Sequence, residues 1–274
     1  MKVGYTEFSY GYAFTENLIR SSTTMPVGAP VFPNLIQEAQ SGFDVQINFP
    51  GVPLFFQYKL PELMRRGTAF EIASGQCPRL SRPFFRIAMM RRDLSRQHAL
   101  LIRLEAKYPS QVFYAAPTLP DASAFNRAYD RAAVAQHSAF FSPTDIGPLP
   151  DDKAHSIAYK SGLSVGYFCS EPRTINALTF EALSSRTSTS LKSDRFSNVE
   201  DTARALREDV LALASRPWRQ TESLLSDRLR ARLAQRTVGE TGTPEQEQVL
   251  TDILVAREIA RVDFGIDLLI AQPR

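Results

Sequence analysis

GFDVQINFPGVPLFFQYKL, at residues 42–60, is the stretch that decides the fold. Two apolar runs flank the tight connection Pro-Gly-Val-Pro at 50–53, which predicts a β-hairpin. Asp44 stands near the start of the first strand, and Gln57 and Lys59 stand two residues apart on the second. Alternate side chains of a strand share a face, so Gln57 and Lys59 are expected to point the same way. A lysine inside such an apolar strand costs free energy, which indicates a function there.

The composition is that of an ordinary globular protein. The chain has 274 residues, of which 43% are hydrophobic and 22% charged. Its 32 basic and 29 acidic residues give a net charge of +3, which is compatible with nucleic-acid binding without requiring it. No apolar run reaches membrane-spanning length and no secretory leader is evident, so we expect a cytoplasmic protein without membrane contact. Cys77 and Cys169 are isolated, which predicts two buried thiols.

The first part of the chain alternates predicted helices and strands, which is typical of a mixed sheet with helices on its faces. We expect this α/β (α+β) domain to span residues 1–183. In particular, the sequence predicts a crossover unit, which consists of a strand at 84–90, a helix at 95–107 and a strand at 111–116. The other predicted elements are helices at 14–20, 61–73 and 125–136, and edge strands at 138–142 and 156–169.

The second part of the chain reads as a helical appendage. Residues 184–198 are rich in Ser, Thr and charge, which predicts a linker or mobile loop. Capping signals and prolines then predict a C-terminal helical region at 199–274, with helices at 199–215 and 219–236 and a third opened by Thr243-Pro244. Residues 266–270 are expected to form a last strand or a docking tail.

The residue types of the hairpin suit phosphodiester hydrolysis. A divalent cation needs oxygen ligands, which the Asp44 carboxylate and the Gln57 carbonyl provide. The Lys59 ammonium would face the same cleft, orient water and offset negative charge. Each residue also has a structural interpretation: Asp44 as a turn carboxylate, Gln57 paired with backbone, and Lys59 reaching past its neighbours to solvent.

The hairpin resembles the D…(D/E/Q)xK signature of the PD-(D/E)xK nuclease superfamily, through Gly-Phe-Asp44 followed by Phe-Gln57-Tyr-Lys59. The glutamine at position 57 resembles the form of this signature in Mrr-type restriction endonucleases. The resemblance implies a restriction-endonuclease-like core and a Mg²⁺- or Mn²⁺-dependent endonuclease, with DNA as the expected substrate and anti-phage defence as the expected setting. It also implies an acid on the first helix, for which Glu7 and Glu38 both qualify and Glu16 is a weaker candidate. Two features depart from the pattern: Gln57 replaces the usual second acid, and residues 61–94 lie outside the minimal core.

Other residues are secondary candidates. Gln97 occupies a place similar to that of a glutamine in RecB-like relatives, and His98 follows it at the same helix start. Arg228, Arg230 and Arg232 form either a solvated helix face or a phosphate-contacting stripe. Alternatively, the C-terminal helices form a surface for a protein partner. The sequence is also compatible with a homo-oligomer. The competing function is a non-catalytic nuclease-like module that binds nucleic acid or a partner, which the neutral Gln57 favours.

Overall fold

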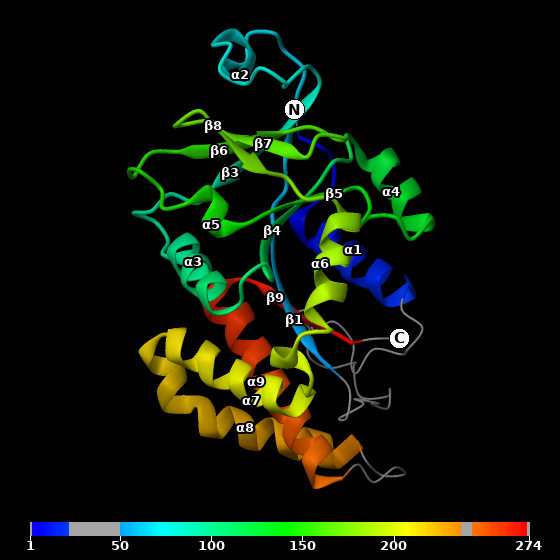
Figure 1. The fold of residues 1–274 in the computed structure, drawn as a ribbon, viewed down its shortest axis with the longest axis vertical. Helices are drawn as coiled ribbons and strands as arrows, with labels where there is room; N and C mark the ends of the chain where they lie inside the picture. The colour runs from blue at the N-terminus through cyan, green and yellow to red at the C-terminus, as the bar shows by residue number, and fades with distance from the viewer. Residues whose placement is uncertain (1, 22–49, 237–242, 273–274) are drawn as a thin grey trace. The chain divides into compact units, whose positions relative to one another are not determined.

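The computed structural model describes residues 2–21, 50–236 and 243–272 (Figure 1). Helices and two β-sheets alternate along these residues, so the expectation of a mixed α/β protein is confirmed. The chain divides into two compact units. Unit 1 comprises residues 1–21 and 56–185, and unit 2 comprises residues 22–55 and 186–274. The first strand of the expected hairpin, at residues 42–49, lies outside the described residues.

A small sheet in unit 1 contains the end of the strand that precedes Lys59. Strand β1 (Val52–Tyr58) contributes its last residues here, beside β4 (Val112–Pro117) and β5 (Ser138–Phe141), in the order β5-β4-β1. The strand prediction for 54–60 is confirmed for residues 54–58. The strand begins earlier, because Val52 and Pro53 belong to it rather than to a turn, and it ends at Tyr58, one residue before Lys59. Every residue of β1 and β4 is buried, which explains their continuous apolar character.

Helix α1 (Glu7–Ser21) covers one face of this small sheet. It begins earlier than the predicted helix at 14–20, because the Thr6 hydroxyl accepts a hydrogen bond from the Ser9 N–H at 3.0 Å and so caps its first turn. The ring of Phe14 lies 5.2 Å from that of Phe56 and 5.6 Å from that of Tyr58. These contacts fix which face of β1 is turned toward α1.

The second sheet of unit 1 has five antiparallel strands in the order β2-β3-β6-β7-β8. Strands β6 and β7 are interior strands, so the prediction of an edge at 156–169 is wrong. Strand β3 pairs with β2 and β6, whereas β4 belongs to the small sheet, so the expected crossover within one sheet is also wrong. The strands are β2 (Glu62–Met64), β3 (Phe84–Met89), β6 (His155–Tyr159), β7 (Val165–Phe168) and β8 (Arg173–Asn176).

The predicted helix at 61–73 is replaced by strand β2 and a short helix α2 (Phe70–Ala73). The strand forms because Glu62 lies opposite Arg86 of β3, with an ion pair of 3.0 Å between their side chains. The following loop carries α2 beyond the five-stranded sheet (Figure 1). We call residues 65–83, between β2 and β3, the excursion.

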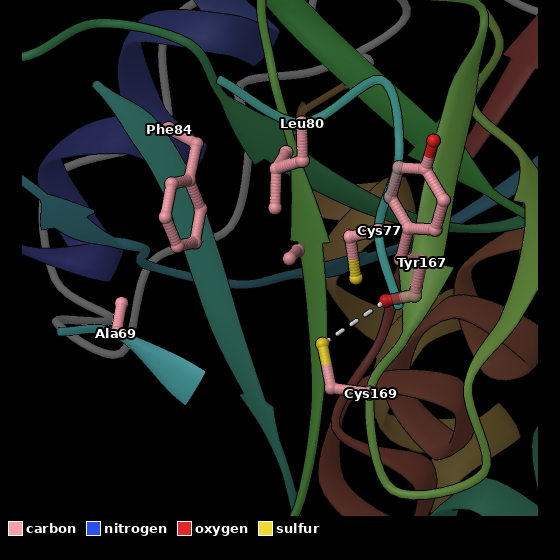
Figure 2. Close-up of a cluster of buried hydrophobic side chains, with 7 residues drawn as sticks. Ala69, Cys77, Leu80, Phe84, Tyr167 and Cys169 are labelled. Atoms are coloured by element: carbon pink, nitrogen blue, oxygen red, sulfur yellow. Dashed lines mark hydrogen bonds between the residues drawn. The ribbon is translucent and has the colours of Figure 1, made fainter. Parts of the chain in front are cut away.

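A buried cluster anchors the excursion to the sheet (Figure 2). Both cysteines lie in this cluster as unpaired, buried thiols, as predicted. The Cys169 thiol donates to the Tyr167 carbonyl at 3.3 Å, and burial raises the pKa of Cys169 to about 12. Both thiols therefore serve as packing groups. The buried members of the cluster are Ala69, Cys77, Leu80, Phe84, Ala158, Tyr167 and Cys169.

Helices α3, α4 and α5 also belong to unit 1. Helix α3 (Gln97–Lys107) begins where the Ser95 hydroxyl accepts a hydrogen bond from the Gln97 N–H at 3.1 Å. Helix α4 (Ala122–Asp130) is shorter than the predicted helix at 125–136 and begins three residues earlier, because Asp121 caps it. Helix α5 (Pro143–Ile146) follows β5.

Unit 2 contains three long helices, α7 (Val199–Leu213), α8 (Arg216–Arg236) and α9 (Pro244–Phe264), as the sequence predicts. Thr243 and Gln246 form a capping box at the start of α9. Strand β9 (Asp267–Ala271) then lies beside β1 in the order β1-β9, which confirms the expected last strand. Val199 and Ala203 of α7 pack with Val249 and Leu250 of α9.

The expected linker at 184–198 is largely helical. Helix α6 (Phe180–Ser190) and a 3-10 turn (Asp194–Phe196) occupy most of it. The Thr179 hydroxyl accepts a hydrogen bond from the Ala182 N–H at 3.3 Å, and Leu183 is buried. A capped first turn with one apolar anchor therefore outweighs the weak helix preference of the Ser and Thr residues that follow. The division between the two units falls within this helix, after Ser185.

Candidate active site

Gln57 and Lys59 lie on the face of the small sheet opposite α1. Their neighbours Phe56 and Tyr58 both contact the ring of Phe14 on that helix. Alternation along the strand then turns Gln57 and Lys59 to the other face. The Lys59 N–H donates to the Ala115 carbonyl at 2.9 Å, so the extended pairing with β4 continues through the lysine.

Gln57 has a buried side chain with one unsatisfied oxygen. The residue is 7% exposed, and its amide nitrogen donates to the Tyr58 carbonyl at 3.2 Å. The carbonyl oxygen Oε1 is buried and accepts no hydrogen bond from the residues that the structure describes. Leaving a buried acceptor unpaired costs about 1 to 3 kcal/mol, so such atoms are rare in folded proteins. Oε1 is therefore an oxygen suited to a cation or a water molecule.

Lys59 is half-buried beside an aromatic ring. Its Nζ lies 6.0 Å from the ring centroid of Tyr114, on β4. Burial lowers the pKa of Lys59, and the carboxylate of Glu7 partly offsets that effect. The ammonium is thus poorly solvated while an acid acts on it from the start of α1. A charge in such surroundings acts strongly on any group that approaches it.

His98 supports the ring beneath the lysine. Its Nε2 lies 2.8 Å from the Gly147 carbonyl, which accepts only, so Nε2 carries the proton. Its Nδ1 then accepts the hydroxyl proton of Tyr114 at 2.8 Å. Burial lowers the pKa of His98, and the nearby charge of Lys59 also disfavours its protonation. Both ring nitrogens are in use, so we interpret His98 as a residue that positions Tyr114.

Replacing Tyr114 with Phe tests this interpretation. We expect the substitution to lower the free energy of unfolding by about 1 to 2 kcal/mol, because the buried Nδ1 of His98 loses its donor. Urea unfolding followed by circular dichroism measures the change. A Tyr114→Phe protein that unfolds at the same urea concentration as the parent would contradict the proposed support.

The candidate acids differ in where they lie. Glu7 is exposed in the first turn of α1, and its charge acts on Lys59. Glu16, the weaker candidate on that helix, instead pairs with Arg20 at 2.6 Å. Glu38 and Asp44 lie outside the described residues. Among residues 2–21, 50–236 and 243–272, no group of three or more His, Cys, Asp or Glu side chains is placed to hold a metal ion.

The secondary candidates fall in both units. Gln97 is the first residue of α3 and is half-buried next to His98. Arg228 and Arg230 are exposed on α8 of unit 2, and Arg230 donates to the Gln248 carbonyl oxygen at 2.9 Å. Arg232 belongs to the same helix, but its side chain is not described. The structure thus gathers Lys59, His98 and Glu7 in unit 1, while the arginines belong to unit 2.

Tyr114 is the residue that sequence reasoning missed. It stands in the buried run Val-Phe-Tyr-Ala-Ala of β4, and a phenol among apolar residues needs a partner for its hydroxyl. That signal was available in the sequence. The identity of the partner depends on how α3 packs against β4.

Comparisons with protein-family models, with curated proteins and with solved structures found no match to this chain. Over the residues that the structure describes, no helix is both long enough and apolar enough to cross a membrane.

Proposed function

We propose that the protein is a metal-dependent nuclease with a restriction-endonuclease-like core, and that Gln57 and Lys59 belong to its active site. The observation that carries the proposal is the buried, unpartnered Oε1 of Gln57, two residues from a poorly solvated lysine. Evolution rarely retains a buried unpaired acceptor or a desolvated ammonium for stability, because each costs free energy. Together they suit a site that receives a cation and a phosphate.

The oxygen donors assigned to the site are of the type that a divalent cation prefers. Gln57 supplies a neutral carbonyl oxygen and Glu7 a carboxylate near Lys59. Asp44 is the further carboxylate that the sequence pattern assigns to the site, and Glu38 is the alternative to Glu7. A bound Mg²⁺ or Mn²⁺ supplies Lewis-acid chemistry toward the phosphate and lowers the pKa of water. With a neutral Gln57 in place of an acid, these carboxylates supply the negative charge that balances the cation.

Lys59 has the most direct role among the described residues. Its ammonium is oriented over the small sheet by Tyr114, which His98 in turn holds in place. A fixed positive charge in a poorly solvated position stabilises the negative charge that develops on the phosphate in the transition state. The lowered pKa of Lys59 also means that this charge is lost at a lower pH than for an exposed lysine. Cleavage is therefore expected to decline as the solution is made alkaline.

The alternative function is a nuclease-like module that binds without cutting. The neutral amide of Gln57 favours it, because a carboxylate at that position would hold a divalent cation more tightly. The two functions share the fold and differ in whether phosphodiester bonds are broken.

A plasmid-nicking assay separates the two functions. We expect conversion of supercoiled plasmid to nicked or linear forms in Mg²⁺ or Mn²⁺ and none in EDTA, because hydrolysis depends on the cation. Gel electrophoresis of the plasmid, with parallel reactions on single-stranded DNA and RNA, gives the result. Absence of metal-dependent cutting on all of these substrates would reject the nuclease and favour the module.

A further inference from the structure

The excursion between β2 and β3 carries a concentration of positive charge. Within residues 65–83 all four arginines are exposed, and the single acid, Glu71, is buried. Lys160, at the end of β6, adds a fifth cation by donating from Nζ to the Ser81 hydroxyl at 2.5 Å. The four arginines are Arg65, Arg66, Arg79 and Arg82.

These cations are brought together by the path of the chain. The guanidinium of Arg82 lies against the backbone of Gly67, so close that a Cβ added there would be 3.1 Å from Nη1. Gly67 directly follows Arg65 and Arg66, so arginines sixteen residues apart in sequence become neighbours. At Arg79 the backbone N–H donates to the Tyr167 hydroxyl at 3.1 Å, which ties the loop to β7.

The two acids near the excursion pair with an arginine outside it. Arg86 of β3 pairs with Glu62 at 3.0 Å and with Glu71 at 3.3 Å. Among the residues that the structure describes, no carboxylate forms an ion pair with any of the four exposed arginines. The four arginines and Lys160 outnumber the two acids, so the surface keeps an excess of positive charge, whose mutual repulsion disfavours the folded loop.

The excursion is nevertheless held in a defined place. The buried cluster of Figure 2 fixes it through Ala69, Cys77 and Leu80, which pack on β3 and β7. A loop that is anchored by buried side chains and keeps its cations unpaired presents them at fixed positions. Fixed, unpaired cations are what a polyanion with regularly spaced charges requires.

We infer that the excursion binds the phosphate backbone of nucleic acid, through Arg65, Arg66, Arg79, Arg82 and Lys160. The inference rests on the proposed nuclease function and adds to it a substrate-binding surface outside the residues around Lys59. Arginine suits this role because its planar guanidinium makes bidentate contacts with phosphate and stays charged. The contacts are to the backbone, so the surface positions nucleic acid without selecting a sequence.

The salt dependence of binding tests the inference. Binding of the full chain to a fluorescent DNA duplex of about 20 base pairs, or two helical turns, is measured in EDTA by anisotropy. Each phosphate contact contributes about 0.9 to the slope of log affinity against log salt concentration. The Arg66→Ala/Arg82→Ala variant should lose about 1.8 from that slope. The fall in affinity from about 50 to about 200 mM salt then becomes about ten-fold smaller than for the parent.

Two control variants isolate the charge effect. Arg103→Ala/Arg131→Ala removes two exposed arginines elsewhere in unit 1 and should keep the parental slope. Phe70→Ala removes an exposed apolar side chain of the excursion, 60% exposed, and should also keep the slope because no charge is lost. A changed slope in Phe70→Ala would indicate that altering the excursion disturbs binding without charge, which contradicts the inference.

The outcomes are separate from those of the nicking assay. Because binding is measured in EDTA, a protein that cuts nothing still gives the expected slopes if the surface is real. A parental slope in Arg66→Ala/Arg82→Ala, or a parent that binds polyglutamate or phosphatidylserine vesicles but not DNA or RNA, would overturn the inference. Neither result would decide whether the residues around Lys59 cleave.

Discussion

Lys59→Ala is expected to lower the rate of plasmid nicking by at least about 100-fold, which is the size of effect seen when one transition-state donor is removed. The ammonium is held over Tyr114 in a poorly solvated place, so water does not replace its charge in the variant. The free energy of unfolding should stay the same or rise, because the burial of a charged amine opposes folding. Initial rates in Mg²⁺ and a thermal unfolding curve provide the two measurements.

Two further lysine substitutions sharpen this result. Lys153→Ala removes a lysine whose side chain is 86% exposed and should nick plasmid as fast as the parent. Lys59→Arg should not restore the parental rate, because a planar guanidinium is larger than the compact ammonium that fits over the ring. If Lys59→Ala nicked plasmid as fast as the parent, the lysine would have no role in cleavage, and the proposed nuclease function would be rejected.

The elements predicted correctly are those whose signals are local. Strands β1, β3 and β4 are buried apolar runs, and α9 begins with a capping box that can be read at Thr243-Pro244. The sequence predicts a helix at 61–73, whereas residues 62–64 form strand β2 because they pair with β3. Residues 184–198 are predicted to be a linker or mobile loop, and the sequence does not indicate the helix found there because that helix depends on the Thr179 cap and one buried leucine.

The site could be predicted only along the strand that carries it. Alternation places Gln57 and Lys59 on one face without knowledge of the fold. The contact of His98 with Tyr114 joins residues of α3 and β4, and no periodicity in the sequence links them. The excursion is a similar case. Arg66 and Arg82 become neighbours because Arg82 packs against Gly67 and because β2 and β3, which flank the excursion, pair with each other. Contacts of this kind depend on packing and need a structure.

The second large effect is expected in unit 2, where Arg207 of α7 joins three helices. Its guanidinium donates to Asp252 of α9 at 2.6 Å and to Glu222 of α8. Asp252 is only 5% exposed, so Arg207→Ala leaves a buried carboxylate without its cation. We expect the free energy of unfolding to fall by about 3 kcal/mol or more, since breaking a buried ion pair from one side costs about that much. Urea unfolding followed through the single tryptophan, Trp218 on α8, reports on this unit.

Arg204→Ala is the matched control for Arg207→Ala, because it removes the same side chain three residues away on the same helix. Arg204 pairs with Glu200 at 2.8 Å and with Asp201 at 3.3 Å, but its side chain is 56% exposed. Exposed pairs contribute less than about 1 kcal/mol, because water screens them and ordering two long side chains costs entropy. If both variants lose the same small free energy of unfolding, the burial of Asp252 does not strengthen its ion pair with Arg207. A loss confined to Arg207→Ala would show that the three helices depend on one shared guanidinium, as the geometry requires.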